Sequence, residues 1–255
     1  MQNKITFLGT GTSQGIPMIG CNCKVCKSSD PKDKRLRTSA YIEYNGLKLV
    51  IDAGPDFRTQ MLRENISYLD AVLLTHHHKD HTGGLDDVRA FNYLYKEAFS
   101  IYAEQRVQES LRKEYYYAFE EHKYPGVPEF NLKTIDEKPF IIKGVEIVPI
   151  RVMHYKLPIL GFRFGDLAYI TDGSFIEDEE LAKLKGVKTL IINTVRREKH
   201  ISHFCLQEAI DICNKIGADS NYLIHLSHQF ECHEELSQNL PQNISPAFDG
   251  LTLKF

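Results

Sequence analysis

Long apolar runs and an excess of one charge are both missing from this sequence. No stretch of eighteen consecutive apolar residues occurs, whereas a membrane-spanning helix needs about twenty. The formal net charge is only -3, so no global basic field would draw the protein to nucleic acid or to an anionic membrane. The apolar stretch within Met1 to Gly9 is too short for a signal peptide. We therefore expect a cytoplasmic protein without a membrane partner, and we do not expect a nucleic-acid partner.

Low-complexity linkers and repeats of fixed period are also missing. A chain of 255 residues with 42% hydrophobic content can bury one large core, so we expect a single domain over residues 1–255. Three of the six cysteines are close together, at Cys21, Cys23 and Cys26. In a reducing compartment such clustering favours a metal site over disulfides.

Strand-like and helix-like segments alternate along the whole chain. Asn45-Gly46 is typical of a two-residue hairpin turn between two short strands. The patterns predict strands over residues 5–8, 41–44, 48–51, 71–74, 144–152, 161–164, 167–171, 189–193, 221–226 and 250–255. They predict helices over residues 84–97, 104–121, 177–184 and 205–216, with a proline-containing loop after the second of these. This order fits an α+β sandwich of two sheets with outer helices.

The densest group of metal-binding residue types is His76-His77-His78-Lys79-Asp80-His81, directly after an apolar run that ends at Thr75. His76 and His78 point the same way if they lie at the end of a strand, because strand side chains repeat every two residues. Asp80 and His81 then fall on the first turn of a helix. The motif can therefore address two metals, and such pairs commonly hydrolyse phosphoesters. Imidazole with carboxylate favours zinc, manganese or iron over calcium.

Further ligands for such a cage should come from strand ends elsewhere in the chain. His154, Asp172 and His225 each follow an apolar strand-like run. Each alone has an ordinary interpretation as a capping aspartate or a buried histidine. Together with the motif at residues 76–81, they are predicted to be metal ligands.

With these ligands in this order, the sequence resembles the metallo-β-lactamase superfamily over essentially the whole chain. The superfamily motif His-x-His-x-Asp-His is followed by a histidine, a bridging aspartate and a last histidine, which match His154, Asp172 and His225. The resemblance implies a four-layer αββα sandwich and a two-metal hydrolase. It also implies that Asp52, at the end of the run Leu49 to Asp52, supports the metal ligands without itself binding a metal.

The cysteine cluster is similar to that of one branch of this superfamily, the PhnP-type cyclic phosphodiesterases. That resemblance implies a separate structural zinc held by Cys21, Cys23, Cys26 and His228. Three thiolates and one imidazole form a closed tetrahedral site, so this zinc should staple the N-terminal loop and take no part in catalysis. Three metal-free thiols are the alternative.

The resemblance also implies a mechanism in which a hydroxide bridging the two metals attacks phosphorus. His203 and Asp80 are the predicted catalytic residues, Asp80 also being a metal ligand. His203 lies where the branch has a histidine suited to protonate the leaving group, although Cys205 replaces the acidic residue that the branch has two places on. A surface histidine at a helix start is the alternative interpretation of His203. Four histidines stay unassigned: His77, His122, His200 and His233.

Several functions remain open. The first is hydrolysis of a small phosphodiester, cyclic ones included, with two divalent ions (manganese or zinc, with iron as a further candidate) and one structural zinc. The others are a tRNA 3′-end endonuclease like ribonuclease Z, a PqqB-like accessory protein that catalyses no hydrolysis, and a thioesterase of the glyoxalase type. The natural substrate cannot be identified from these patterns, and a homodimer is left open.

Overall fold

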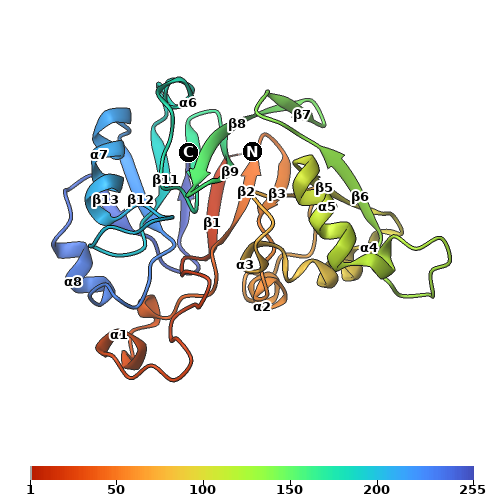
Figure 1. Ribbon diagram of the computed structural model, residues 1–255, viewed down its shortest axis with the longest axis horizontal. Coiled ribbons are helices and arrows are strands. Elements are labelled where there is room, and N and C mark those ends of the chain that lie inside the picture. The colour runs from red at the N-terminus through yellow and green to blue at the C-terminus, as the bar shows by residue number, and fades with distance from the viewer. Residues whose placement is uncertain (1) are drawn as a thin grey trace.

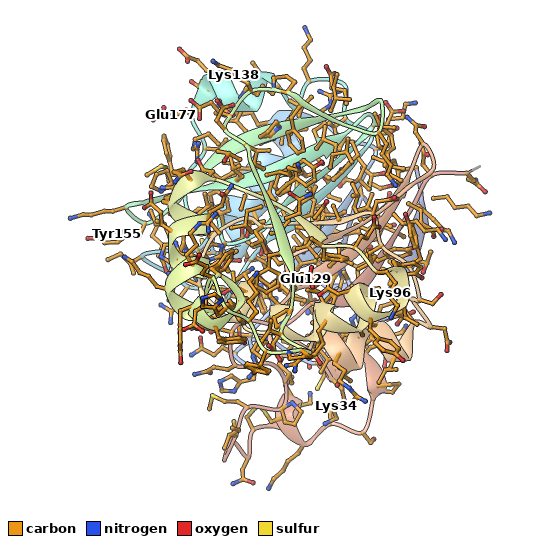
Figure 2. All side chains as sticks on the ribbon, turned by 90° about the vertical axis from the view of Figure 1, so that its right-hand side faces the viewer. Lys34, Lys96, Glu129, Lys138, Tyr155 and Glu177 are labelled. Carbon is orange, nitrogen blue, oxygen red and sulfur yellow. The ribbon has the colours of Figure 1, made fainter. Side chains whose placement is uncertain are left out.

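Two seven-stranded sheets pack face to face in the computed structural model, which describes residues 2–255 (Figure 1). Helices cover the outer face of each sheet, with α4 and α5 on one side and α7 and α8 on the other. The segment that contains α1 projects beyond the sandwich, and Lys34 marks this end of the molecule in Figure 2. The chain therefore forms the predicted four-layer αββα sandwich.

The first sheet combines an antiparallel and a parallel half. Asn45 and Gly46, with φ of 48° and 88°, make the predicted tight turn between β2 and β3. Pairing is antiparallel from β14 to β3 and parallel from β3 to β6. In spatial order the strands are β14 (Thr252–Lys254), β1 (Lys4–Gly9), β2 (Ser39–Tyr44), β3 (Leu47–Ile51), β4 (Ala71–Leu73), β5 (Phe99–Ala103) and β6 (Phe130–Thr134).

The second sheet has a similar division. Pairing is parallel from β13 to β10 and antiparallel from β10 to β7. The strands in order are β13 (Ile244–Pro246), β12 (Ser220–Ile224), β11 (Thr189–Asn193), β10 (Leu167–Ile170), β9 (Leu157–Phe164), β8 (Val145–His154) and β7 (Phe140–Ile142). The carboxyl ends of parallel strands meet at one edge of a sheet, which is where ligands commonly bind.

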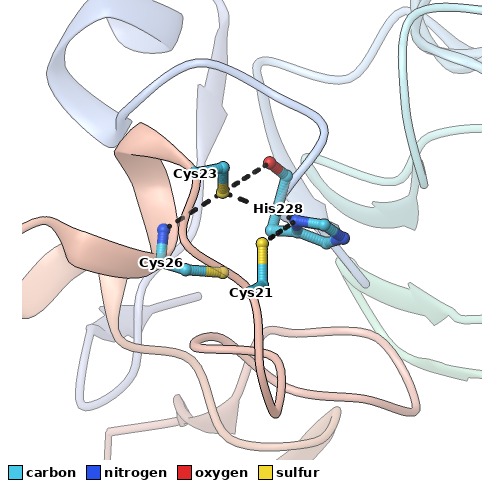
Figure 3. A group of neighbouring side chains, drawn as sticks. All are labelled: Cys21, Cys23, Cys26 and His228. Atoms are coloured by element: carbon cyan, nitrogen blue, oxygen red, sulfur yellow. Dashed lines mark hydrogen bonds between the residues drawn. The ribbon is translucent and has the colours of Figure 1, made fainter.

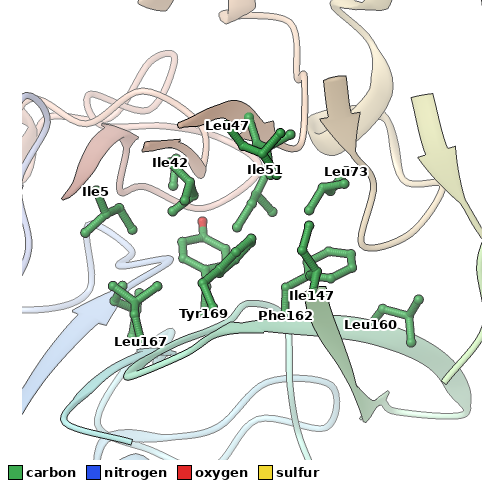
Figure 4. Close-up of a cluster of buried hydrophobic side chains, with 14 of the residues drawn as sticks. Ile5, Ile42, Leu47, Ile51, Leu73, Ile147, Leu160, Phe162, Leu167 and Tyr169 are labelled. Atoms are coloured by element: carbon green, nitrogen blue, oxygen red, sulfur yellow. The ribbon is translucent and has the colours of Figure 1, made fainter. Parts of the chain in front are cut away.

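The core between the sheets is apolar and fully buried. Ile5, Ile42 and Leu73 from the first sheet face Phe162 and Tyr169 from the second (Figure 4). Two further apolar layers lie between each sheet and its own helices. Three layers of apolar contacts thus hold four layers of secondary structure together, which gives the strand ends a rigid base.

The helices are short and pack through one apolar face each. Phe57, Leu85 and Val107 cover the first sheet, while Leu206 and Leu236 cover the second. The helices are α1 (Lys24–Lys27), α2 (Phe57–Arg63), α3 (Lys79–Thr82), α4 (Arg89–Tyr95), α5 (Gln105–Glu114), α6 (Asp178–Ala182), α7 (Leu206–Ile216) and α8 (His233–Gln238), with 3-10 turns at η1 (Pro31–Asp33), η2 (Leu85–Val88) and η3 (Tyr116–Ala118). Among the described residues, none of these helices has the length and apolar character that a bilayer crossing requires.

Most predicted elements are present, but the region after the metal motif differs. The predicted helix over 84–97 is a 3-10 turn followed by α4, and the one predicted over 104–121 ends at Glu114. It ends there because Tyr115 turns inward and its hydroxyl donates to the carbonyl of Thr82 (2.7 Å). Sequence patterns also missed β5, β6, β7, β13, α1, α2 and α8. β6 is a partly exposed edge strand and β7 and β13 have only three residues, so their periodicity is weak.

Candidate metal centre

Side chains from both sheets converge at the shared edge where the strands end. His76 and His78 lie between β4 and α3, and α3 carries Asp80 and His81. The three other predicted ligands come from the second sheet: His154 ends β8, Asp172 follows β10 and His225 follows β12. The structure thus brings these seven predicted ligands together, although four separate segments of the chain supply them. We call these seven residues the central cluster.

The backbone is strained where these strands end. Four residues other than glycine have a left-handed φ here: Asp52 (61°), Tyr155 (55°), Asp172 (57°) and His225 (58°). Such a conformation costs about 1–3 kcal/mol and persists only where the surroundings fix it, commonly at functional sites. Tyr155 follows His154 directly and projects from the surface of the molecule (Figure 2).

A glycine makes the approach of α3 possible. A Cβ at Gly54 would lie 2.0 Å from the carbonyl oxygen of Asp80. Only glycine therefore lets the segment after β3 pass so close to the backbone of Asp80. Next to this approach, the Ala53 amide donates to the carbonyl of His81 (2.8 Å), and Asp52 accepts from the His81 ring.

One set of donors comes from three histidines. His76 Nε2 lies 3.0 Å from His78 Nδ1. A ring nitrogen of His154 completes a group in which all ligand atoms lie within 4.8 Å of one another. Such a group fits one metal ion.

A second set is centred on the two aspartates. His81 Nε2 lies 3.2 Å from both Asp80 Oδ2 and Asp172 Oδ2, and His225 Nε2 lies 3.3 Å from Asp172 Oδ1. Asp172 also groups with His76 and His81. Its carboxylate is therefore shared between the group with His76 and His81 and the group with Asp80 and His225.

The outward nitrogens of four imidazoles are all occupied as donors. His81 Nδ1 donates to Asp52 Oδ2 (2.6 Å), and His154 Nδ1 donates to the carbonyl of Ser202 (2.7 Å). His76 Nδ1 donates to Thr75 Oγ1 (3.0 Å), because that hydroxyl gives its own proton to Asp52. The fourth, His225 Nδ1, lies 3.3 Å from Thr38 Oγ1. With Nδ1 protonated, a neutral ring presents a lone pair at Nε2, which is the form that binds a metal.

The charges in the cluster also suit divalent cations. Burial raises the pKa of Asp172, but His225 and His81 outweigh it and hold that pKa well below its usual range. Burial lowers the pKa of His76 and of His225. Carboxylates are thus ionised while these imidazoles are neutral, as metal binding requires.

His81 shows what the cluster lacks. Burial lowers its pKa, but Asp172, Asp52 and Asp80 raise it well above the usual value. Within residues 2–255, its Nε2 is also a buried polar atom without a hydrogen-bond partner. Three carboxylates around one imidazole leave negative charge uncompensated, so the residues present fit a pair of divalent ions.

His203 lies beside the central cluster. Its Nδ1 is 3.7 Å from Asp172 Oδ1 and has no hydrogen-bond partner among the described residues. Its ring centre is 4.7 Å from that of His154 and 4.8 Å from that of His225. Burial and His225 lower its pKa to about 3. The ring is therefore neutral in the free protein, so it would have to gain a proton before it could act as the predicted acid.

The predicted structural site forms a second group, which we call the cysteine cluster: Cys21, Cys23, Cys26 and His228 (Figure 3). His228 Nδ1 lies 3.3 Å from Cys21 Sγ and 3.5 Å from Cys23 Sγ. The amide of Cys26 donates to Cys23 Sγ, which lowers the pKa of Cys23 to about 6, while burial raises the pKa of Cys26 to about 11. All six cysteines are free. Three thiols and one imidazole at these distances fit a tetrahedral zinc ion.

The four unassigned histidines have different surroundings. His200 lies beside His203, with ring centres 5.1 Å apart. His233 Nδ1 is 3.2 Å from the buried Arg35 guanidinium. Burial lowers the pKa of His77, which is outside the ligand groups, and His122 is exposed.

Sequence reasoning missed several residues that hold the central cluster. Asn193, at the end of β11, donates to and accepts from the backbone of Gly173 (3.0 and 2.7 Å) and so holds the turn after Asp172. Its position at a strand end next to β10 could have indicated it. Thr75 and Thr38 contact ligand histidines, and no motif identifies Thr38.

Comparisons with known proteins agree with this architecture. A family model described as a beta-lactamase superfamily domain matches residues 48–226. A crystal structure of a diphosphatase from the PhnP family superposes with a TM-score of 0.93 and 38% identity, covering 100% of this chain and 98% of that one.

Two curated relatives match only in part. A Porphyromonas gingivalis protein named octanoyltransferase is 44% identical over 248 residues, which is 96% of this chain and 50% of that protein. A ribonuclease Z of Nanoarchaeum equitans is 25% identical over 177 residues, which is 65% of this chain and 54% of the relative. The chain therefore spans about half the length of these curated relatives.

Proposed function

This chain belongs to the metallo-β-lactamase superfamily, in the branch of PhnP and ribonuclease Z, and from that premise we propose that it is a metal-dependent hydrolase of small phosphodiesters. One observation carries the proposal: the Nε2 atoms of His81 and His225 face the carboxylates of Asp80 and Asp172. These nitrogens and oxygens are hydrogen-bond acceptors when the imidazoles carry their protons on Nδ1, so they lack donors. Such an arrangement is costly unless cations occupy it.

The residues divide between two ions. His76, His78 and His154 would hold the first, Asp80, His81 and His225 the second, and Asp172 would bridge them. Bound there, two divalent ions would lower the pKa of a shared water and offset charge on phosphoryl oxygens. Asp52 keeps His81 oriented through its 2.6 Å hydrogen bond. The cysteine cluster would hold a structural zinc that fixes the loop around α1.

His203 would give a proton to the leaving alkoxide. Its Nδ1 has no hydrogen-bond partner within residues 2–255 and lies at the edge of the cluster next to Asp172. Burial and His225 lower the pKa of this ring in the free protein, and an anionic phosphoryl group beside it would raise that pKa. Substrate binding would therefore create the acid.

Leaving groups of different basicity test this role. His203→Ala should slow hydrolysis of an alkyl phosphodiester by about 10²–10⁴-fold, the usual contribution of a general acid. It should hardly change hydrolysis of bis-p-nitrophenyl phosphate, whose leaving group needs no proton. Equal losses on both substrates with unchanged metal content would rule out the acid role, and loss of metal would make His203 a ligand or a support.

The substrate class is supported by the relatives but needs direct measurement. The full-length structural relative is named a diphosphatase, so the panel must contain a dinucleoside diphosphate beside cyclic and linear phosphodiesters. Protein purified without added metal should contain about three ions per chain by mass spectrometry, one of them resisting chelation. Phosphodiester hydrolysis that disappears on chelation and returns with manganese or zinc is the expected result.

Other outcomes would identify other functions. Cleavage of precursor tRNA would support the ribonuclease Z alternative, and iron-dependent oxygen uptake without hydrolysis would support an accessory role like that of PqqB. Absence of tightly bound metal and of hydrolysis would reject the proposal. The cytoplasmic location and the homodimer stay predictions.

A second candidate is hydrolysis of an octanoyl thioester. The 44% identical relative is named an octanoyltransferase, although this chain matches only half of its length. The sequence also left a thioesterase of the glyoxalase type open as an alternative function. Release of free thiol from an octanoyl thioester, together with an inert phosphodiester panel, would favour this candidate.

A further inference from the structure

We propose that Thr38 is a positioning residue that fixes the protonated nitrogen and the orientation of His225. Thr38 is a buried residue of the segment just before β2, and it belongs to no metal-binding motif. The inference rests on the proposed two-metal centre and is independent of its substrate.

The hydroxyl of Thr38 has one proton, and that proton is already used. Oγ1 donates to the carbonyl of Gly11 (2.7 Å), which also accepts from the Thr38 amide (3.1 Å). His225 Nδ1 lies 3.3 Å from the same Oγ1. Since the hydroxyl can only accept in this second bond, His225 must donate from Nδ1. Nε2 then presents its lone pair to the central cluster.

No other group in residues 2–255 performs this task for His225. Thr38 Oγ1 is the hydrogen-bond partner that the structure gives to Nδ1. The ring is stacked between His81 and His203, at centre distances of 6.2 and 4.8 Å, but stacking does not choose which nitrogen carries the proton. Asp172 Oδ1, 3.3 Å from Nε2, would by itself favour a proton on the wrong nitrogen. Thr38 opposes that choice.

The backbone holds Thr38 rigidly. Residues 10–12 run as an extra extended segment between residues 35–38 and Leu226: Gly11 donates to the carbonyl of Leu36 (2.9 Å), and Leu226 donates to that of Thr10 (2.9 Å). A Cβ at Gly11 would lie 3.0 Å from the carbonyl oxygen of Arg35, which is a tight contact, so glycine suits this close packing. Thr38 and His225 are thus fixed to the same backbone frame.

Two substitutions separate the hydroxyl from the shape of the side chain. Thr38→Val removes the hydroxyl at nearly constant volume, and Thr38→Ser keeps it. Thr6→Val is a matched control. Thr6 lies in β1, and its hydroxyl pairs with that of Thr252 in β14 (2.9 Å) and with no residue of the central cluster. Binding of Co²⁺ or Mn²⁺ is followed by calorimetry and absorption spectroscopy, after zinc has been bound at the cysteine cluster.

We expect Thr38→Val to lower the affinity for one of the two ions of the central cluster by about 10- to 100-fold, which is the usual effect of losing the hydrogen-bond partner of a ligand histidine. The other ion and the zinc should bind as in the wild type. Thr38→Ser should restore affinity to within a few fold, and Thr6→Val should change neither ion. Wild-type affinity for both ions in Thr38→Val would overturn the proposal.

The protonated nitrogen can also be observed directly. Long-range ¹H–¹⁵N spectra of histidine-labelled, metal-free wild type should show the proton of His225 on Nδ1, and a proton on Nε2 would overturn the proposal even if Thr38→Val failed to fold. This readout does not depend on turnover. A wild type that binds metal but cleaves no phosphoester would therefore reject the proposed function and leave the role of Thr38 standing.

Discussion

The central cluster and the cysteine cluster are both rich in metal-binding side chains, yet the chain builds them in different ways. Strand ends of both sheets hold the central cluster, and His76, His81 and Asp172 are almost fully buried. Three of the four residues of the cysteine cluster come from one loop and short helix, whose apolar support is essentially Ile16, Val25 and Cys26.

This difference indicates which cluster depends on its ion for shape. Left-handed residues, buried hydrogen bonds and sheet packing fix the central cluster before any ion arrives. The loop around α1 has few such contacts, so a metal must supply much of its order. Removing ions should therefore abolish function at one cluster and local structure at the other.

The largest effect should follow from a change at Asp172. Asp172→Asn keeps the size of the side chain but removes the charge that faces both ion sites. Replacing even an outer partner of a metal ligand costs about 10- to 100-fold in affinity or activity, so this variant should lose more than about 100-fold. Activity, ion content and circular dichroism are measured together. A variant that loses activity together with its fold would contradict the idea that the sandwich alone shapes this cluster.

The next effect concerns the cysteine cluster. Cys23→Ser should release one zinc per chain and make the loop around α1, residues 17–30, sensitive to protease, while the rest of the sandwich stays resistant. Limited proteolysis with mass spectrometry locates the cuts. Cys213→Ser is the control, because Cys213 is buried in the core at α7 away from both clusters. Cuts that appear equally in both variants would mean that the zinc does not order the loop.

A smaller effect is expected at Asn193, which clamps Gly173 next to Asp172. Asn193→Ala leaves the buried amide of Gly173 unpaired, while its carbonyl still accepts from the Phe204 amide (2.7 Å), and this should cost about 1–3 kcal/mol of stability. It should also weaken an ion of the central cluster. Asn221→Ala removes a comparable buried bond, to the carbonyl of Asn243 (3.1 Å), at the far end of the sheet. Equal ion affinity in the two variants would show that the clamp serves stability alone.

The smallest effect is expected at the ion pair of Asp70 and Lys143, which belongs to neither cluster. Burial raises the pKa of Asp70, but Lys143 (2.5 Å) and the Lys48 amide outweigh it, and the pKa ends below its usual value. A carboxyl with a lowered folded pKa adds stability above its unfolded pKa near 4 and loses that stability as pH falls through the folded pKa.

Lys143→Met should therefore be less stable than the wild type by about 0.2–1 kcal/mol at pH 7, as is typical of surface ion pairs. The difference should vanish in strong acid and shrink in 1 M salt. Urea unfolding at pH 7 and pH 2.5 measures both. A difference that persists at low pH would assign the effect to packing of the Lys143 side chain.

Much of the fold could be predicted because its strands are short apolar runs between clear turns, such as Asn45-Gly46. The region after the motif was harder, since Tyr115 leaves the helix for a tertiary contact with Thr82. Strands β6 and β7 form only because neighbouring strands offer them an edge. Local patterns cannot show such contacts.

For the site, the sequence alone determined the chemical types: a compact His/Asp motif, three strand-end ligands and a cysteine group, all readable from spacing. Tertiary structure decided which atoms meet and which nitrogen of each ring is free. Asn193 and Thr38 act on residues 20 and 187 positions away in the chain. The first of these hydrogen bonds depends on which strands become neighbours within one sheet, and the second on how the two sheets stack. Both are properties of the whole fold, which no local run of residues encodes.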